Sequence, residues 1–229
     1  MLTHLQPSPR LRTWVDCYLY VRDLEGVHCD RAVTTAPRPG GVLTINFGRP
    51  NRMSDGAATP VQSLLGIQTR TRTWLPDADS HFVMVLLTPA GLAALAPRAG
   101  AGLTDRPVEL SGILRNRQAT GLFDAASRVM GQASQALDTW LLAHFAAAEK
   151  IADVRLAQSA CVALAMSNRV EVAARHLGIS RRHLARTLSH HLGVSPKSLI
   201  DLYRLNRSVR AVQRGADDSA DGFADQAHQ

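Results

Sequence analysis

Arginine residues gather in one short part of the chain, and their chemistry is that of polyanion binding. Residues 169–214 hold nine Arg and one Lys against two acidic residues, in a 229-residue chain whose net charge is +7. A guanidinium group presents its donors in a planar fork that matches a phosphate or the O6 and N7 edge of guanine. A basic stretch of this density therefore predicts a surface that binds nucleic acid.

The elements that must position these arginines follow a helix-turn-helix pattern. Asn168 is expected to cap a first helix, with Glu171 at the capping-box position, and Gly178 is expected to end it in the left-handed conformation. Ser180 is expected to cap a second helix over residues 181–192. Two helices joined by such a turn are typical of proteins that place the second helix in the major groove of DNA.

The second helix of this pattern has an apolar stripe and a basic face. Leu184 and Leu188 recur at helical spacing, which predicts that they are buried. Arg182 and Arg186 are four residues apart and share another face, so we expect them to contact bases or backbone. Arg181 lies at the helix start and is expected to contact a phosphate.

A third, longer helix follows directly. Ser195 is expected as its cap and Pro196 as its first residue, and its periodicity continues to about Gln213. Arginines recur along its exposed sides, so it could connect two DNA-reading units. The expected DNA contacts of the whole segment are Ser180, Arg181, Arg182, His183, Arg186, Lys197, Arg204 and Arg207.

Residues 173–213 resemble the first helix-turn-helix and the connecting helix of the AraC/XylS family of transcription regulators. The most specific part is the step LGVSP at 192–196, followed by a helix that carries YRL at 203–205. The later sequence GFADQAH, at 222–228, resembles the turn and recognition-helix start of the family's second such motif. The resemblance implies a sequence-specific transcription regulator that binds double-stranded DNA.

The chain departs from the family pattern near its end. Only eight residues separate Gln213 from Gly222, where the family has a full helix, and the chain ends directly after residues 222–228. Residues 215–229 carry four Asp and no Lys or Arg, the wrong sign for contact with phosphate. We therefore expect a family member truncated within its second motif, with no stable motif in residues 215–229.

The first part of the chain shows short strand patterns separated by turns, which favour a small barrel or a sandwich. Helical periodicity begins later in the chain. Strands are expected at 13–21, 32–35, 41–47, 63–73 and 80–87, loops at 48–60 and 97–107, and helices at 89–95, from about 121, at 134–150 and at 152–166.

These patterns predict an α+β protein of two domains. Residues 1–150 would form a β-rich sensor or dimerisation domain that includes helices, and residues 151–229 an all-α helix-turn-helix domain that is incomplete at its C-terminus. The first domain resembles the sensor domains found ahead of such DNA-binding units. That resemblance implies a cupin-like barrel able to bind a small-molecule effector, and a helical part able to form a homodimer.

The sequence argues against an enzyme, a metal site and a membrane protein. No nucleophile elbow, zinc-protease or P-loop motif occurs, so we expect no catalysis and no cofactor. The expected barrel region holds His4, His28 and His81, a poor set of metal ligands. The longest apolar run, at 82–96, is too short to span a bilayer. We expect a cytoplasmic protein with no membrane partner.

Two other functions remain open at this point. A regulator without its second motif could act by dimerising with complete subunits and sequestering them. The basic segment alone would also support non-specific binding of nucleic acids. Binding to specific and scrambled duplexes over a range of salt concentrations separates these functions.

Overall fold

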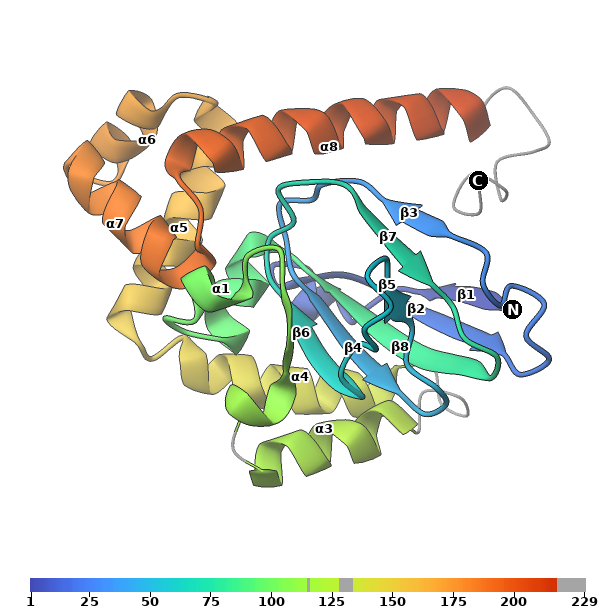
Figure 1. Cartoon of the computed structure of the whole chain (residues 1–229). Coiled ribbons are helices and arrows are strands. Elements are labelled where there is room, and N and C mark those ends of the chain that lie inside the picture. Colours follow the sequence, from blue (N-terminus) through green and yellow to red (C-terminus); the bar gives the residue numbers. More distant parts are fainter. Residues whose placement is uncertain (115, 128–133, 218–229) are drawn as a thin grey trace.

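The chain folds as α+β, with a β-rich N-terminal part followed by helices, as the sequence predicted (Figure 1). The structure is a computed structural model and describes residues 1–114, 116–127 and 134–217. Among these residues, no helix is long and apolar enough to cross a membrane. Residues 222–228, whose sequence resembles part of a second helix-turn-helix, lie outside the described residues.

The strands pair into two antiparallel sheets. Their bounds are β1 (Leu2–Leu5), β2 (Val15–Asp23), β3 (Val33–Thr35), β4 (Val42–Asn46), β5 (Arg52–Met53), β6 (Gln62–Leu65), β7 (Arg72–Leu75), β8 (Ser80–Leu87) and β9 (Pro107–Glu109). The larger sheet has the order β1-β2-β8-β4-β6-β9 and the smaller one the order β3-β7-β5. The sequence left open whether the strands form a barrel or a sandwich. Because the hydrogen-bonded strands form two separate sheets, the structure is a two-sheet sandwich.

The helices mostly follow the strands in the chain, although η1 precedes β2, and α1 and α2 precede β9. They are η1 (Pro9–Leu11), α1 (Pro89–Leu95), α2 (Gly100–Leu103), η2 (Leu110–Gly112), α3 (Asn116–Ser127), α4 (Gln135–Ala148), α5 (Ala152–Ser167), α6 (Val170–His176), α7 (Arg181–Leu192) and α8 (Pro196–Asp217). The predicted helices at 89–95, 134–150 and 152–166 are confirmed to within two residues at each end.

The larger sheet separates an internal cavity from a layer of helices. Leu19 and Val21 of β2 face the cavity, whereas Tyr18, one residue away, points to the opposite face, as strand alternation requires. There the Tyr18 hydroxyl donates to Asp138 Oδ1 of α4 at 2.6 Å. Helices α3 and α4 thus cover one face of the larger sheet, and the smaller sheet covers the other (Figure 1).

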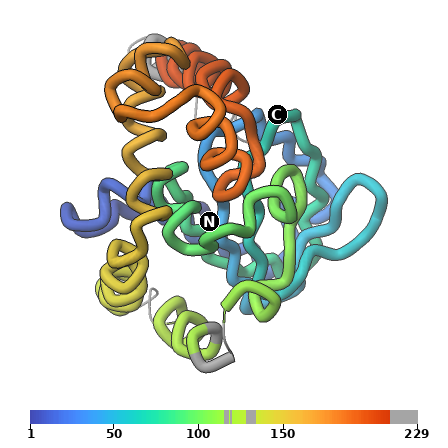
Figure 2. Tube along the Cα trace, turned by 90° about the vertical axis from the view of Figure 1, so that its left-hand side faces the viewer, coloured from blue at the N-terminus to red at the C-terminus, as the bar shows by residue number. Residues whose placement is uncertain are grey.

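The remaining helices lie at one end of the sandwich, except that α8 starts there and runs alongside the strands (Figure 1). Figure 2 shows α5 rising from the layer of α3 and α4 to the group formed by α6, α7 and α8. Helix α1 packs against α5, and α2 packs against α7. One apolar core continues from the sheet, at Val85, through Leu92 of α1 to Leu188 of α7. The domain boundary at residue 150 stays a prediction.

Several local expectations were wrong. Residues 63–73 form no single strand, because the chain leaves the larger sheet after Leu65 and enters the smaller one at Arg72. The expected loop at 48–60 contains β5, and the loop at 97–107 contains α2. Short elements of two to four residues, such as these, carry too little periodicity to be recognised in a sequence.

Candidate nucleic-acid interface

Helices α6 and α7 form the predicted helix-turn-helix. Gly178 lies in the turn with a φ of +66°, a conformation that favours glycine. The Ile179 N–H donates to the Ala174 carbonyl at 3.0 Å and closes the turn. Ala173 and Ala174 are buried, so the small side chains of α6 let α7 approach closely.

Of the two capping residues expected for α6 and α7, one is confirmed and one was wrong. The Ser180 hydroxyl accepts the His183 N–H at 3.1 Å, which confirms Ser180 as the N-cap of α7. The expectation for Asn168 was wrong. This residue ends α5 with a φ of +52°, and α6 begins after Arg169, whose side chain makes no capping hydrogen bond. Asparagine suits both a helix N-cap and a left-handed C-cap, and the end of α5 decides between them.

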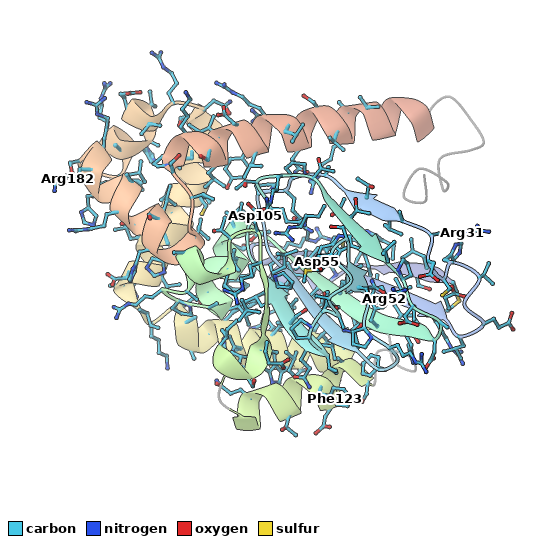
Figure 3. All side chains as sticks on the ribbon, in the orientation of Figure 1. Arg31, Arg52, Asp55, Asp105, Phe123 and Arg182 are labelled. Atoms are coloured by element: carbon cyan, nitrogen blue, oxygen red, sulfur yellow. The ribbon has the colours of Figure 1, made fainter. Side chains whose placement is uncertain are left out.

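Helix α7 has one buried face and one basic face. Leu184 and Leu188 are fully buried, as predicted, and so is Leu192. Arg182 and Arg186 are exposed on the opposite side, and within the described part of the chain neither takes part in a hydrogen bond or ion pair. Figure 3 shows Arg182 projecting away from the molecule at the end of the helical group. This face can therefore meet a ligand without breaking an internal contact.

The other expected residues at the start of α7 are partly engaged. Arg181 forms an ion pair with Glu171 of α6 at 3.1 Å, with both side chains more than half exposed. An exposed pair of this kind contributes about 0–1 kcal/mol, so a phosphate can replace Glu171 at little cost. The pKa of Glu171 is lowered by hydrogen bonding to its own backbone N–H and then by Arg181. His183 is half-buried at the rim.

The C-terminal half of α7 borders the N-terminal part of the chain, which the sequence did not predict. Arg186, Ser189 and His190 line one side of an open groove of about 600 Å³. Residues of the α2 region form the other side, among them Arg98 and Ile113. A groove of about 600 Å³ cannot hold a DNA duplex. The major groove of a duplex is by itself about 12 Å wide.

Helix α8 begins as predicted, with Ser195 Oγ accepting the Ser198 N–H at 3.1 Å and Pro196 as the first helical residue. Lys197 is exposed in its first turn. Arg204 lies 3.6 Å from Asp201 of the same helix, an exposed pair. Lys197 and Arg204 are therefore accessible to a phosphate.

Two further arginines of α8 hold the helix in place. Arg207 donates to Asn168 Oδ1 at 2.8 Å and to the Ala165 carbonyl at 3.4 Å, where α5 ends. Arg210 lies 3.7 Å from Asp16 of β2, a carboxylate that also binds Arg38 at 3.1 Å. Arg207, one of the expected DNA contacts, is exposed and already makes hydrogen bonds within the chain, so its contact with DNA stays a prediction.

Buried titratable groups support these helices. The Tyr203 hydroxyl of α8 donates to the Cys161 carbonyl of α5 at 3.3 Å, and burial raises the pKa of Tyr203. Burial also raises the pKa of the Cys161 thiol to about 12. Burial lowers the pKa of His191 on α7, whose Nδ1 has no hydrogen-bond partner within the described residues. These groups are uncharged near pH 7 and belong to the packing of the helices.

A second hollow lies between the two sheets. It is a cavity of about 320 Å³ whose wall includes apolar side chains of both sheets, among them Leu65, Trp74 and Phe82. None of the described residues that line it is Lys or Arg. Asp23 does, but its carboxylate already accepts the Val27 N–H at 3.0 Å and the His28 N–H at 2.8 Å.

Several of the polar side chains in the cavity wall are hydrogen-bonded to one another. Trp74 Nε1 donates to Thr35 Oγ1 at 3.0 Å, and Thr35 donates to Gln68 Oε1 at 3.4 Å. Asn51 Oδ1 is buried and has no hydrogen-bond partner in the part of the chain that is described.

Comparisons with known proteins give two distant likenesses in structure. No protein-family model and no curated protein sequence matches the chain. ToxT from Vibrio cholerae O395 shows a TM-score of 0.37 at 13% identity, over 93% of this chain and 82% of that one. The AraC-like transcriptional activator CuxR shows a TM-score of 0.25 at 17% identity, over 84% and 73%. Scores this low do not by themselves establish a function.

Proposed function

We propose that the chain is a sequence-specific DNA-binding transcription regulator whose helix α7 enters the major groove. The observation that carries this proposal is the basic face of α7, where Arg182 and Arg186 are exposed on a capped and packed helix and make no hydrogen bond or ion pair with another described residue. The resemblance of residues 173–213 to the AraC/XylS family points the same way. A bidentate arginine–guanine contact contributes about 1–3 kcal/mol of discrimination against a wrong base.

The other expected contacts would position α7 on the duplex. The free N–H groups at the start of α7, next to Ser180, suit a phosphate oxygen, and Arg181 can exchange its exposed pair with Glu171 for the same phosphate. Lys197 and Arg204 would contact the backbone from α8. His183 lies at the rim of the same face, and the exposed Arg207 joins α8 to the end of α5.

Fluorescence anisotropy of the full chain tests the proposal. The probes are a duplex from the chain's own promoter region and a scrambled duplex of equal length, over a series of salt concentrations. We expect tighter binding to the promoter duplex, with an affinity that falls steeply as salt rises. Equal affinity for both duplexes would favour non-specific binding. No binding to either would contradict the proposal and favour the dimerising function.

We further propose that the sandwich cavity takes up a small effector that is neutral and mostly apolar. Its volume of about 320 Å³ lies at the lower end of the usual range for ligand sites. None of the described residues that line the cavity is Lys or Arg, and its wall includes apolar side chains of both sheets. A homodimer stays a prediction.

A matched pair of probes tests the cavity. We expect benzyl alcohol to raise the melting temperature of the chain, and benzoate, of similar size but charged, to leave it unchanged. Ser63→Leu places a larger side chain in the cavity and should abolish the rise in melting temperature with benzyl alcohol. Equal shifts with both probes, or a shift that survives Ser63→Leu, would contradict this assignment.

A further inference from the structure

The open groove between α7 and the α2 region carries positive charge on both of its walls. Arg186 and His190 line it from α7, and Arg98 lines it from the N-terminal part of the chain. None of the described residues that line the groove is Asp or Glu. Two permanent cations on opposite walls, with no lining carboxylate, favour an anion between them.

The wall formed by the α2 region offers little steric hindrance. Four of the residues that line it are small, namely Ala99, Ala101, Gly102 and Gly112. A Cβ on Gly102 or on Gly112 would meet nothing within 4 Å. A sugar-phosphate backbone can therefore come close to this wall, and Arg98 is the cation that it would meet there.

Arg98 can be reached by an anion from solvent. Its φ is +67°, a conformation that is uncommon for residues other than glycine. Its Nη2 lies 3.0 Å from Asp153 Oδ2 of α5, and the two side chains are 61% and 59% exposed. An exposed pair of this kind adds little stability, so a phosphate can replace Asp153 as the partner of Arg98 at little cost.

The backbone next to Arg98 is fixed against the end of α7. A Cβ on Gly100 would lie 2.5 Å from Leu192 N, and a Cβ on Gly193 would lie 2.6 Å from the Gly100 carbonyl carbon. Thr104 Oγ1 lies 3.4 Å from the Leu192 carbonyl, to which it can donate. Because backbone meets backbone here, Arg98 keeps its place beside α7, and a contact prepared in this way loses less entropy on binding.

The length of α7 places its C-terminal half beside the phosphates of a bound duplex. Its 12 residues span about 18 Å, whereas the major groove is about 12 Å wide and about 8.5 Å deep. The start of α7, with Arg182, can therefore reach the bases, while the later turns lie at the level of the sugar-phosphate backbone. Arg186 and His190 follow Arg182 at four-residue steps, and they lead from the bases towards Arg98.

We propose that Arg98, in the N-terminal part of the chain, is a contact to the DNA backbone, and that one phosphate of the duplex seated on α7 lies between Arg98 and the side chains of Arg186 and His190. The inference rests on the proposed function and extends the DNA-binding surface beyond the helix-turn-helix. A phosphate contact fixes the position of a protein on the duplex without reading its sequence. Arg98 thus helps to set the depth and orientation of α7.

Three variants of the full chain test this inference. Arg98→Ala removes the cation and Arg98→Lys keeps it. Arg106→Ala is the control of equal charge, because Arg106 is exposed in the same segment but is not among the described residues that line the groove. Anisotropy measures the affinity of each protein for the promoter duplex and for the scrambled duplex over a series of salt concentrations.

We expect Arg98→Ala to weaken binding to both duplexes by about three- to fivefold at low salt, the upper range for an exposed ion pair. The salt slope should fall by about 1, as for the loss of one phosphate contact, and the ratio of the two affinities should stay unchanged. Arg98→Lys should keep the wild-type slope. Arg106→Ala should change affinity by about twofold or less.

Gly102→Glu tests the groove without altering Arg98. A Cβ at this position meets nothing within 4 Å, so the variant should fold, which its melting temperature checks. The new carboxylate would repel a phosphate in the groove. We expect a larger loss of affinity than in Arg106→Ala, although each of the two substitutions lowers the net charge by one unit.

The alternative outcomes are distinct. Equal losses in Arg98→Ala and Arg106→Ala would mean that Arg98 contributes only general charge, and would overturn the inference. Unchanged affinity and slope in Arg98→Ala, with the wild type still preferring the promoter duplex, would overturn the contact and leave the proposed function intact. Absence of DNA binding in every protein, wild type included, would overturn both the contact and the proposed function.

Discussion

The arginines of α7 and those of α8 differ in what they contact, although both helices are basic. On α7, Arg182 and Arg186 are exposed and have no internal partner within the described residues. On α8, Arg207 is held by the end of α5 and Arg210 by Asp16 of β2. The first pair is available to a ligand, whereas the second pair fastens the long helix to the rest of the molecule.

The difference shows that a charge count locates a polyanion-binding segment but does not assign its residues. An arginine side chain is long enough to reach either outward or back to a neighbouring element. Which it does depends on where an acceptor lies, and Asn168 and Asp16 come next to α8 only in the folded chain. The comparison can be tested by removing one arginine at a time.

The largest effect is expected at Arg182. Arg182→Ala should lower affinity for the promoter duplex by about 5- to 150-fold, the equivalent of about 1–3 kcal/mol for a bidentate base contact, without a change in melting temperature. Affinity is measured by anisotropy at fixed salt. Arg31→Ala removes an equal charge from the exposed surface of the sandwich, away from α7 (Figure 3). Equal losses in both variants would mean that Arg182 contributes only general charge.

Arg207 should behave in the opposite way. Arg207→Ala removes the hydrogen bonds to Asn168 and Ala165, so the free energy of unfolding should fall by about 1 kcal/mol, typical of a lost hydrogen bond. DNA affinity should change by about twofold or less. Urea unfolding and a salt series measure the two quantities. A flattened salt slope with unchanged stability would place Arg207 on phosphate and end the contrast between the helices.

Arg210 should show a smaller effect of the same kind. Its pair with Asp16 is partly exposed and 3.7 Å long, so Arg210→Ala should cost about 0.5 kcal/mol of stability. Asp16→Asn should cost more, because Arg38, only 19% exposed, loses its carboxylate partner as well. The two variants are compared by urea unfolding in low salt. A larger loss for Arg210→Ala than for Asp16→Asn would refute this ranking.

The buried face of α7 should give the smallest effect, a dependence on pH. Burial holds the pKa of His191 below its ordinary value, with the charges of His190 and Arg98 acting in the same direction and Asp153 opposing them. The unfolded chain therefore binds the proton more readily, and stability falls as pH drops below about 6.5.

Replacing His191 by Leu should reduce this loss of stability between about pH 7 and pH 5. The loss should not vanish, since burial also lowers the pKa of His81 and His144. Thermal melting of both proteins over this range measures the effect. An equally steep fall in His191→Leu would show that this histidine does not contribute.

Much of the interface could be predicted from the sequence because its signals are local. Ser180 as a cap, Gly178 in the turn and the leucine spacing of α7 depend on residues within a few positions of one another. The same is true of α1, which begins at Pro89 after Thr88 as its cap. Asn168 was misassigned because its side chain suits either of two helix ends.

The amino-acid sequence by itself determined the fold class, the helix-turn-helix and the basic face of α7, since each follows from local spacing and capping. Only the tertiary structure decided that Arg207 contacts Asn168 and that Arg210 contacts Asp16. It also decided that a cavity lined by Asn51 lies between the two sheets. It alone placed Gly100 against Gly193. These contacts join residues that are far apart in the chain, and no periodicity records which distant backbones will meet.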